Sequence, residues 1–378
     1  MNNGDGASEG EWVIAEAPAR VDMSGGWSDT PPITNEHGGV VTNVAVKVDG
    51  IRPIGAKIRK IPEFELLIVV ENSREDGPKI LRCKTFDDMK DYCNPAAPGA
   101  LIKAAFLCTN TVVLLSSQSL AEQLKEKHGC GFEIRTWSHL HFGSGMGTSS
   151  ILAGVVCAAI WRIMSRSYDD RELLHLVMKV EKMLTIGGGW QDQVGGIVPG
   201  VKMTRSPARE PLEILPEILD VCEETLMKVI TNMALIYTGK TRLAKDILQI
   251  VIARWRARTP EIVNNVHNLT KNAEQCAEAW VEGDLKKMGH CLNVYREQKK
   301  IMAPGSETEE ICEIINSITP FTHGCCFAGA GGGGYLLVIT KEPNIHTKIE
   351  KILQDIAKGN NSYTVHRIEV DTEGLTVK

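Results

Sequence analysis

The sequence predicts a mixed α+β fold in two lobes. Its 378 residues suit two to three domains or one large two-lobed protein. Short strand-like segments and turns fill much of the first half, whereas helical patterns dominate from residue 243 onward. Prolines punctuate residues 207–216, the best candidate for a boundary. We therefore expect an N-terminal lobe at 11–206 and a C-terminal lobe at 207–378, after a disordered N-terminus at 1–10 that is rich in Gly, Asn, Asp and Ser.

Short apolar runs between turn-rich links predict the strands. In chain order they span residues 12–16, 39–48, 64–70, 131–136, 233–237, 335–340 and 363–371, with a further strand or hairpin at 195–203. Apolar residues at helical spacing predict the helices. These span residues 99–116, 148–165, 169–184, 243–258, 260–282, 284–301, 307–317 and 345–357. Asp169 and Asp170 suit the cap and first turn of the third helix.

The composition is that of an ordinary globular protein, with 43% hydrophobic and 24% charged residues. A formal net charge of −5 argues against nucleic acid or an anionic membrane as the main partner, because those surfaces select basic proteins. The eleven cysteines include no CxxC pair, which argues against zinc or a disulfide framework. With no signal segment and no apolar run that could cross a bilayer, we expect a cytoplasmic protein.

One glycine-rich segment predicts an anion site; it reads His141-Phe142-Gly143-Ser144-Gly145-Met146-Gly147-Thr148-Ser149-Ser150. Free N–H groups and the helix dipole at a helix start favour phosphate, and glycines let the backbone approach it closely. A dinucleotide fingerprint would need glycine where Thr148 stands, and the Walker A pattern is also absent here. We interpret residues 143–150 as a nucleotide triphosphate site; a helix start of small residues that only packs closely is the alternative.

Two acids downstream are candidates for chemistry. Glu181 falls on the margin of the apolar stripe of the 169–184 helix, where a Mg²⁺ ion bound to triphosphate would be a fitting partner. The alternative is an exposed glutamate paired with a lysine. Asp192 follows three glycines in a predicted turn, and an aspartate there can accept or orient the proton of an attacking hydroxyl. It can equally be a simple turn former.

The segment at 17–32 is dense in polar and turn residues directly after a predicted strand. Short polar side chains on a rigid Gly/Pro frame suit recognition of several hydroxyls, as in a sugar, and Trp27 and Asp29 are the candidates. Arg20 could pair with Asp192 or neutralise a transferring phosphoryl group. A plain surface turn is the alternative.

Three glycine motifs and two acids in this order resemble the GHMP small-molecule kinases. The motifs lie at 17–29, 143–150 and 329–334, and the resemblance spans nearly the whole chain. Within that family the chain is most similar to the kinase portion of fucokinases, through the runs 17–22, 24–32, 187–196 and 237–242. Heptose kinases acting at the anomeric hydroxyl share a looser form. The resemblance implies ATP- and Mg²⁺-dependent phosphorylation of a sugar, L-fucose, at its C1 hydroxyl.

The resemblance also implies roles for particular residues. Asp192 would be the catalytic aspartate with Arg20 as its basic neighbour, and Ser149 and Glu181 would hold Mg²⁺. The loop 143–150 would bind the phosphates of ATP. The substrate-binding residues would be Trp27, Asp29, Gly331 and Gly332.

Two departures from the family pattern stand out. His141 occupies a position where the family usually has proline, which affects the rigidity of the start of the phosphate loop. The large N-terminal part of some fucokinases has no counterpart here, and the sequence does not tell a free-standing kinase from a piece of a longer chain. It also leaves open the oligomeric state, a heptose-type substrate, and a regulator that binds sugar and nucleotide without catalysis.

Overall fold

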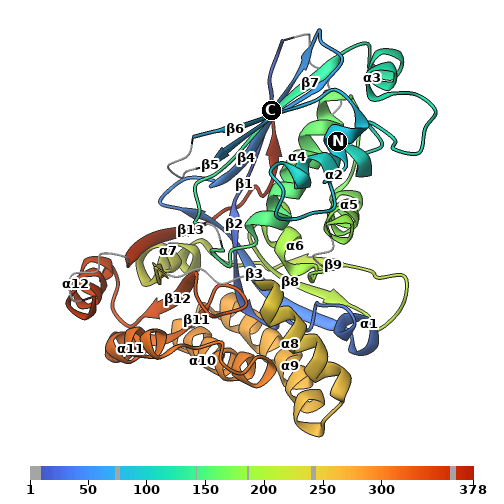
Figure 1. Ribbon diagram of the computed structural model, residues 1–378. Helices are drawn as coiled ribbons and strands as arrows, with labels where there is room; N and C mark the ends of the chain where they lie inside the picture. The colour runs from blue at the N-terminus through green and yellow to red at the C-terminus, as the bar shows by residue number, and fades with distance from the viewer. Residues whose placement is uncertain (1–9, 73–76, 142, 185–186, 240–243, 358–362) are drawn as a thin grey trace.

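The computed structural model describes residues 10–72, 77–141, 143–184, 187–239, 244–357 and 363–378. The predicted disordered N-terminus at 1–10 lies outside these ranges except for Gly10, which is in a turn. The chain forms two lobes, each built on one sheet with helices packed against it (Figure 1), so the predicted α+β class is confirmed. No helix within the described ranges is long and apolar enough to cross a membrane.

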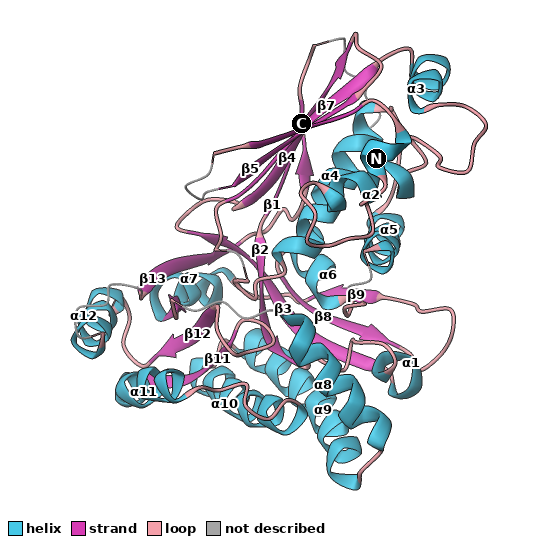
Figure 2. Ribbon diagram, viewed as in Figure 1, coloured by secondary structure: helices cyan, strands magenta, loops and turns pink. Residues whose placement is uncertain are grey.

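A six-stranded sheet in the order β14-β1-β4-β7-β5-β6 forms the first lobe. Its strands are β1 (Val13–Ala17), β4 (Ile54–Ile61), β5 (Leu66–Asn72), β6 (Lys79–Cys83), β7 (Gly131–Ser138) and β14 (Thr376–Val377). The helices of this lobe are α2 (Ala100–Cys108), α3 (Leu120–His128), α4 (Thr148–Ile163) and α5 (Asp170–Met183), with a 3₁₀ turn at Phe86–Met89. They lie on one side of the sheet (Figure 2), where α4 packs on β1 and β4. Alternate residues of β4, namely Ile54, Ala56 and Ile58, are fully buried.

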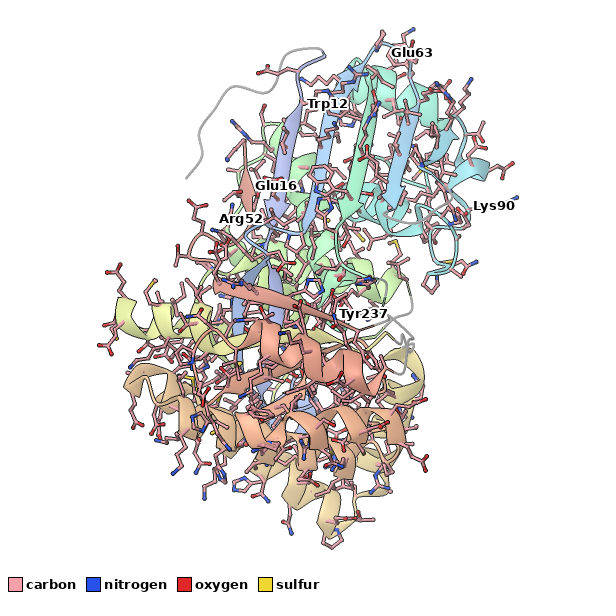
Figure 3. The ribbon with its side chains drawn as sticks, turned by 90° about the vertical axis from the view of Figure 1, so that its left-hand side faces the viewer. Trp12, Glu16, Arg52, Glu63, Lys90 and Tyr237 are labelled. Carbon is pink, nitrogen blue, oxygen red and sulfur yellow. The ribbon has the colours of Figure 1, made fainter. Side chains whose placement is uncertain are left out.

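The opposite face of this sheet is turned toward the viewer in Figure 3, where Trp12 and Glu16 are labelled. No described helix covers it. Lys57 Nζ and the Arg59 guanidinium carbon lie 4.9 Å and 4.7 Å from the centroid of the Trp12 ring. The sheet is mixed, since β5 pairs with β7 in parallel, but β4 is antiparallel to both of its neighbours. Because the described helices cover only one face of the sheet, polar and apolar residues alternate along β4.

An eight-stranded sheet forms the second lobe, in the order β11-β12-β10-β13-β3-β8-β9 with β2 paired to β3. Its strands are β2 (Ala19–Ser24), β3 (Gly39–Val48), β8 (Val201–Ser206), β9 (Leu215–Ile218), β10 (Met233–Tyr237), β11 (Thr322–Phe327), β12 (Tyr335–Thr340) and β13 (Thr364–Val370). Its helices are α1 (Ile33–His37), α7 (Glu223–Asn232), α8 (Ala244–Ala257), α9 (Pro260–Glu282), α10 (Leu285–Met302), α11 (Glu309–Ile318) and α12 (His346–Ile356), with a 3₁₀ turn at Thr319–Phe321. Strands from both sides of the proposed boundary at residue 207 share this sheet. The boundary therefore remains a proposal about the chain and does not separate the two sheets.

The chain crosses from one sheet to the other at Pro18, which separates the end of β1 from the start of β2. Proline has no N–H to donate to a ladder, so it suits the break between two strands. The short helix α6 (Gln191–Ile197) lies at the same junction, since it packs on α4 of the first lobe and on β2 and β3 of the second. Residues just after Pro18 are thereby brought next to α6.

Four predicted elements have the observed bounds, namely β3, β10, β12 and α9. Helix α9 begins with Pro260 and ends before Gly283, whose φ of 67° is left-handed. Two predictions were wrong. The helix predicted at 99–116 ends at Cys108, shortly before Asn110 with its φ of 57°. The strand or hairpin predicted at 195–203 begins instead as the end of α6, and β8 starts only at Val201.

Candidate active site

The glycine-rich loop connects β7 to the start of α4. Gly143, Gly145 and Gly147 have φ values of 68°, 74° and 72°, a left-handed conformation that glycine adopts without strain. Gly147 is the N-cap of α4, and no side chain caps this helix. The first N–H groups of α4 therefore have no side-chain acceptor, the arrangement that an anion site needs, and phosphate binding here stays a prediction. Phe142 lies outside the described residues.

The third glycine segment packs directly against this loop. A Cβ on Gly329 would come within 2.5 Å of the carbonyl oxygen of Gly145, and one on Gly334 within 2.5 Å of that of Ser144. Tyr335 donates its backbone N–H to Ser144 O at 3.0 Å. Glycine is thus required for the contact between the two segments.

The predicted substrate residues Gly331 and Gly332 belong to the same segment, with φ values of 93° and 80°. The backbone N–H of Gly332 donates to Ser306 O at 2.7 Å. That N–H group is therefore engaged within the protein, and the assignment of these two glycines to the substrate remains a prediction.

Arg20 ties both glycine segments to Asp192. Arg20 lies on β2, and its Nε and one terminal guanidinium nitrogen donate hydrogen bonds to Asp192 Oδ1 at 2.8 Å and 2.6 Å. The other terminal nitrogen donates to Gly145 O at 2.7 Å and to Ala328 O. The side chain is buried, and the carboxylate of Asp192 raises the pKa of the Arg20 guanidinium although burial itself opposes the charge. The predicted pair of Arg20 with Asp192 is present.

The sequence predicts Asp192 in a glycine-rich turn, whereas the structure places it in the first turn of the helix α6. Its side chain is 32% exposed, whereas Glu181 and Asp29 are buried. A Cβ added to Gly147 would lie 3.3 Å from Asp192 Cβ, which places the aspartate beside the phosphate loop. An accessible carboxylate with one oxygen held by arginine can receive a proton on its other oxygen.

Glu181 of α5 is buried, and Ser150 of α4 donates its hydroxyl hydrogen to Glu181 Oε1. Its other oxygen, Oε2, is buried without a hydrogen-bond partner. Burial raises the pKa of this carboxyl to about 8, and the charges of Asp192 and Asp29 add to the effect. The alternative of an exposed glutamate paired with lysine is thus wrong.

The family resemblance implies that Ser149 and Glu181 together hold Mg²⁺, whereas the structure brings the hydroxyl of the neighbouring Ser150 to Glu181. Ser149 is exposed in the first turn of α4. Glu181 with its free oxygen and a nearby serine hydroxyl fits Mg²⁺, which takes few protein oxygens and keeps its waters. No described group of three or more His, Cys, Asp or Glu residues could hold a metal by itself.

Asp29 and Trp27 are both buried, and Asp29 lies against Gly189 in the glycine turn that precedes α6. Asp29 is fully buried, and its two oxygens accept hydrogen bonds from the backbone and side-chain nitrogens of Gln191 at 3.0 Å and 3.4 Å. Its pKa rises to about 7, chiefly because of burial. Asp29 therefore holds the first turn of α6, and both of its carboxylate oxygens are engaged by Gln191. Trp27 has a φ of 77° and a buried indole N–H without a hydrogen-bond partner.

His141 lies at the start of the phosphate loop and contacts two tyrosines of the second lobe. Its ring stacks on Tyr237, with centroids 3.9 Å apart and planes at 11°, and its Nδ1 lies 3.1 Å from Tyr335 Oη. Figure 3 shows Tyr237 at the level where the lobes meet. Aromatic stacking thus restrains this position, where the family pattern has the rigid proline ring.

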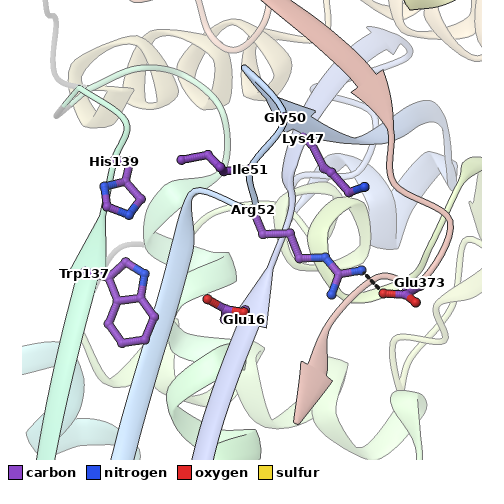
Figure 4. A pocket seen from close by; sticks show the side chains of 8 residues that line it. All are labelled: Glu16, Lys47, Gly50, Ile51, Arg52, Trp137, His139 and Glu373. Carbon is purple, nitrogen blue, oxygen red and sulfur yellow. Dashed lines mark hydrogen bonds and ion pairs between the residues drawn. The ribbon is translucent and has the colours of Figure 1, made fainter. Parts of the chain in front are cut away.

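A cavity of about 420 Å³ lies elsewhere, beside β1 and the link from β3 to β4 (Figure 4). It is lined by Glu16, Lys47, Gly50, Ile51, Arg52, Trp137, His139 and Glu373. None of the predicted site residues is among them. Arg52 is held there by Asp371 and Glu373.

Sequence reasoning missed three buried residues next to Arg20, namely Asp22, Tyr295 and Lys299. Asp22 lies two residues after Arg20 on β2 and thus shares its face of the strand. Lys299 continues the buried positions of α10 at helical spacing after Leu292 and Tyr295. A lysine within an apolar stripe is the signal that could have found it.

The sequence pattern of the family described as GHMP kinases N terminal domain matches residues 115–200. Together with a relative that is 34% identical over 91% of this chain and with solved structures of the same fold, this match places the chain in the GHMP kinase family, with the two-lobed GHMP kinase fold.

Two curated relatives are particularly similar. The chain is 34% identical over 352 residues to the L-fucokinase/L-fucose-1-P guanylyltransferase of Bacteroides fragilis, an alignment that covers 91% of this chain and 36% of the relative. It is 29% identical over 343 residues to the bifunctional fucokinase/GDP-fucose pyrophosphorylase of Arabidopsis thaliana, covering 91% of this chain and 31% of the relative. The chain thus spans about a third of the length of these relatives.

Among solved structures, the D-glycero-D-manno-heptose 1-phosphate kinase of Bacteroides thetaiotaomicron matches with a TM-score of 0.67 at 18% identity. The match covers 97% of this chain and 98% of that structure. Since the identity is low, this likeness supports the fold alone.

Proposed function

We propose that this protein is a sugar kinase that transfers the γ-phosphoryl group of ATP to the C1 hydroxyl of L-fucose, with Mg²⁺. The observation that carries the proposal is the Arg20 guanidinium, which joins Asp192 to the carbonyls of both glycine segments. One accessible carboxylate beside a phosphate loop suits phosphoryl transfer to an alcohol. The choice of L-fucose rests on the relative that is 34% identical, and cytoplasmic location remains an expectation.

In this proposal MgATP, when bound, supplies the phosphoryl group and the positive charge that offsets it. Asp192 accepts the proton of the C1 hydroxyl while that oxygen forms a bond to the γ-phosphorus. The bond from this phosphorus to the β–γ bridging oxygen breaks, which leaves ADP. Arg20 holds Asp192 in place and adds positive charge beside the transferred group.

The Mg²⁺ ion would be held by Glu181 with the hydroxyls of Ser149 or Ser150. The N–H groups at the start of α4 would bind the phosphates. Trp27 and Asp29 would form the sugar side of the site, either directly or through Gln191.

The test is ADP release by the purified chain with ATP, Mg²⁺ and a panel of monosaccharides that includes L-fucose, D-galactose and a heptose. We expect turnover with L-fucose and a product that carries phosphate at C1. Turnover with a heptose alone would contradict the substrate proposal, and sugar binding without any ADP release would favour a regulator. Asp192→Asn should lose activity, whereas Asp355→Asn, an exposed change on α12, should not.

A further inference from the structure

Three successive backbone carbonyls at the end of β11 all accept hydrogen bonds from buried cations. Lys299 Nζ of α10 donates to Phe327 O at 3.0 Å and to Gly329 O at 2.7 Å. The carbonyl between them, that of Ala328, accepts from Arg20. The chain that leads into the third glycine segment is thus held by two side chains from two different elements.

The Lys299 ammonium is satisfied in full at this position. It has three N–H donors, and its three acceptors are the two carbonyls and Asp22 Oδ2, which lies 3.3 Å away. Lys299 and Asp22 are 2% and 1% exposed. Tyr295, one turn earlier on α10, donates its hydroxyl hydrogen to the same Asp22 oxygen. A charge pair so deeply buried is weak evidence for stability, because desolvation offsets the attraction between the charges.

The consequence of these bonds reaches the phosphate loop. Gly329 is in van der Waals contact with Gly145, and a Cβ at either position would collide with the other segment or crowd it. A shift of the Gly329 carbonyl would therefore move the surface against which Gly145 rests. Lys299 itself lies on α10 and reaches the loop only through the backbone of 327–329.

We propose that Lys299 is a positioning residue for nucleotide binding, which fixes the third glycine segment against the phosphate loop. The inference rests on the proposed nucleotide site at 143–150. This positioning role differs from that of a simple stabilising ion pair, because it depends on the hydrogen bonds from Lys299 to the two carbonyls and not on the neutralisation of Asp22.

A double-mutant cycle separates the two roles. Lys299→Met leaves Asp22 as an unpaired buried charge, whereas Asp22→Asn with Lys299→Met removes both charges. Asp22→Asn alone gives the fourth corner. The matched control is Lys287→Met, which removes a lysine of the same helix that pairs with Glu282 at 3.0 Å on the surface.

The measurement is the affinity for MgADP by calorimetric titration, together with the thermal midpoint of each variant. We expect Lys299→Met to lower the affinity for MgADP about tenfold or more, because two hydrogen bonds to the carbonyls are lost. The double variant should recover the thermal midpoint but not the affinity for MgADP. Lys287→Met should bind as the unchanged protein does.

Affinity that recovers together with the thermal midpoint in the double variant would overturn the proposal, as would unchanged affinity in Lys299→Met. Because MgADP binding needs no sugar, the outcome is distinguishable from a failure of the proposed function. A chain that binds MgADP and phosphorylates no sugar contradicts only the function. A chain that does not bind MgADP contradicts both.

Discussion

Replacing Arg20 with lysine tests the centre of the site while keeping a buried positive charge. The guanidinium makes four hydrogen bonds, two to Asp192 and one to each of the Gly145 and Ala328 carbonyls. A lysine ammonium is a single point on a flexible stem and cannot span these three groups. If it loses two charge-assisted bonds of about 1.5 kcal/mol each, the cost is about 3 kcal/mol, or roughly a hundredfold in kcat/KM.

The assay is initial-rate ADP release at varied ATP and sugar, with the thermal midpoint measured alongside. Arg205→Lys is the matched control, since this arginine of β8 pairs with Glu274 of α9 and the two side chains are 43% and 45% exposed. We expect less than about a twofold change there, because exposed ion pairs contribute little. If Arg20→Lys stays within about threefold of the unchanged protein, the guanidinium does not organise the site as we describe.

Three further outcomes are expected. Burial raises the pKa of Asp29 from 3.8 in the unfolded chain to about 7 in the folded protein. Its contribution to the unfolding free energy is therefore greatest below pH 3.8 and declines as the pH rises to about 7. Asp29→Asn should flatten this part of the pH profile of the unfolding free energy. Gly145→Ala should lower the affinity for MgADP, and it should lower the stability of the protein more than Gly129→Ala does. Both glycines have a left-handed φ, but only a side chain at Gly145 would crowd Gly329. Equal effects of the two substitutions would contradict the contact between Gly145 and Gly329. Lys202→Met should cost about 2–4 kcal/mol in denaturant unfolding, since its ammonium bonds three carbonyls around the end of α6.

The sequence predicts the parts of the site that are local patterns. Glycines before hydroxyl residues, a carboxylate at a helix margin and an arginine after a strand can each be recognised within a few residues. The pairing of Glu181 with Ser150 in place of Ser149 shows the limit of such local patterns. A step of one residue along a helix moves the hydroxyl by about 100° around the helix axis. Which hydroxyl faces α5 depends on how the two helices pack.

Other features have no local signature. The acceptors of Lys299 are backbone carbonyls, which every residue carries, and they come from a segment about thirty residues away. The helix α6 likewise begins where the carboxylate of Asp29, far earlier in the chain, accepts from the N–H of Gln191. Propensity alone predicts a glycine-rich turn or strand there, and the tertiary hydrogen bond decides for the helix.

The distribution of charge in the site also indicates where a divalent cation belongs. Arg20 is paired with Asp192 and Lys299 with Asp22, whereas Glu181 has no cationic partner among the described residues, and one of its oxygens lacks any hydrogen bond. A bound cation would therefore stabilise Glu181 more than the other buried carboxylates, because it would hold this carboxylate ionised despite its burial.

We expect Mg²⁺ added to the ADP-bound protein to raise the thermal midpoint above that with ADP and EDTA, through preferential binding to the folded state. In Glu181→Gln this rise should largely disappear, while ADP with EDTA stabilises both proteins alike. An undiminished Mg²⁺ effect in the variant would mean that the cation is held by the nucleotide and the serine hydroxyls without Glu181.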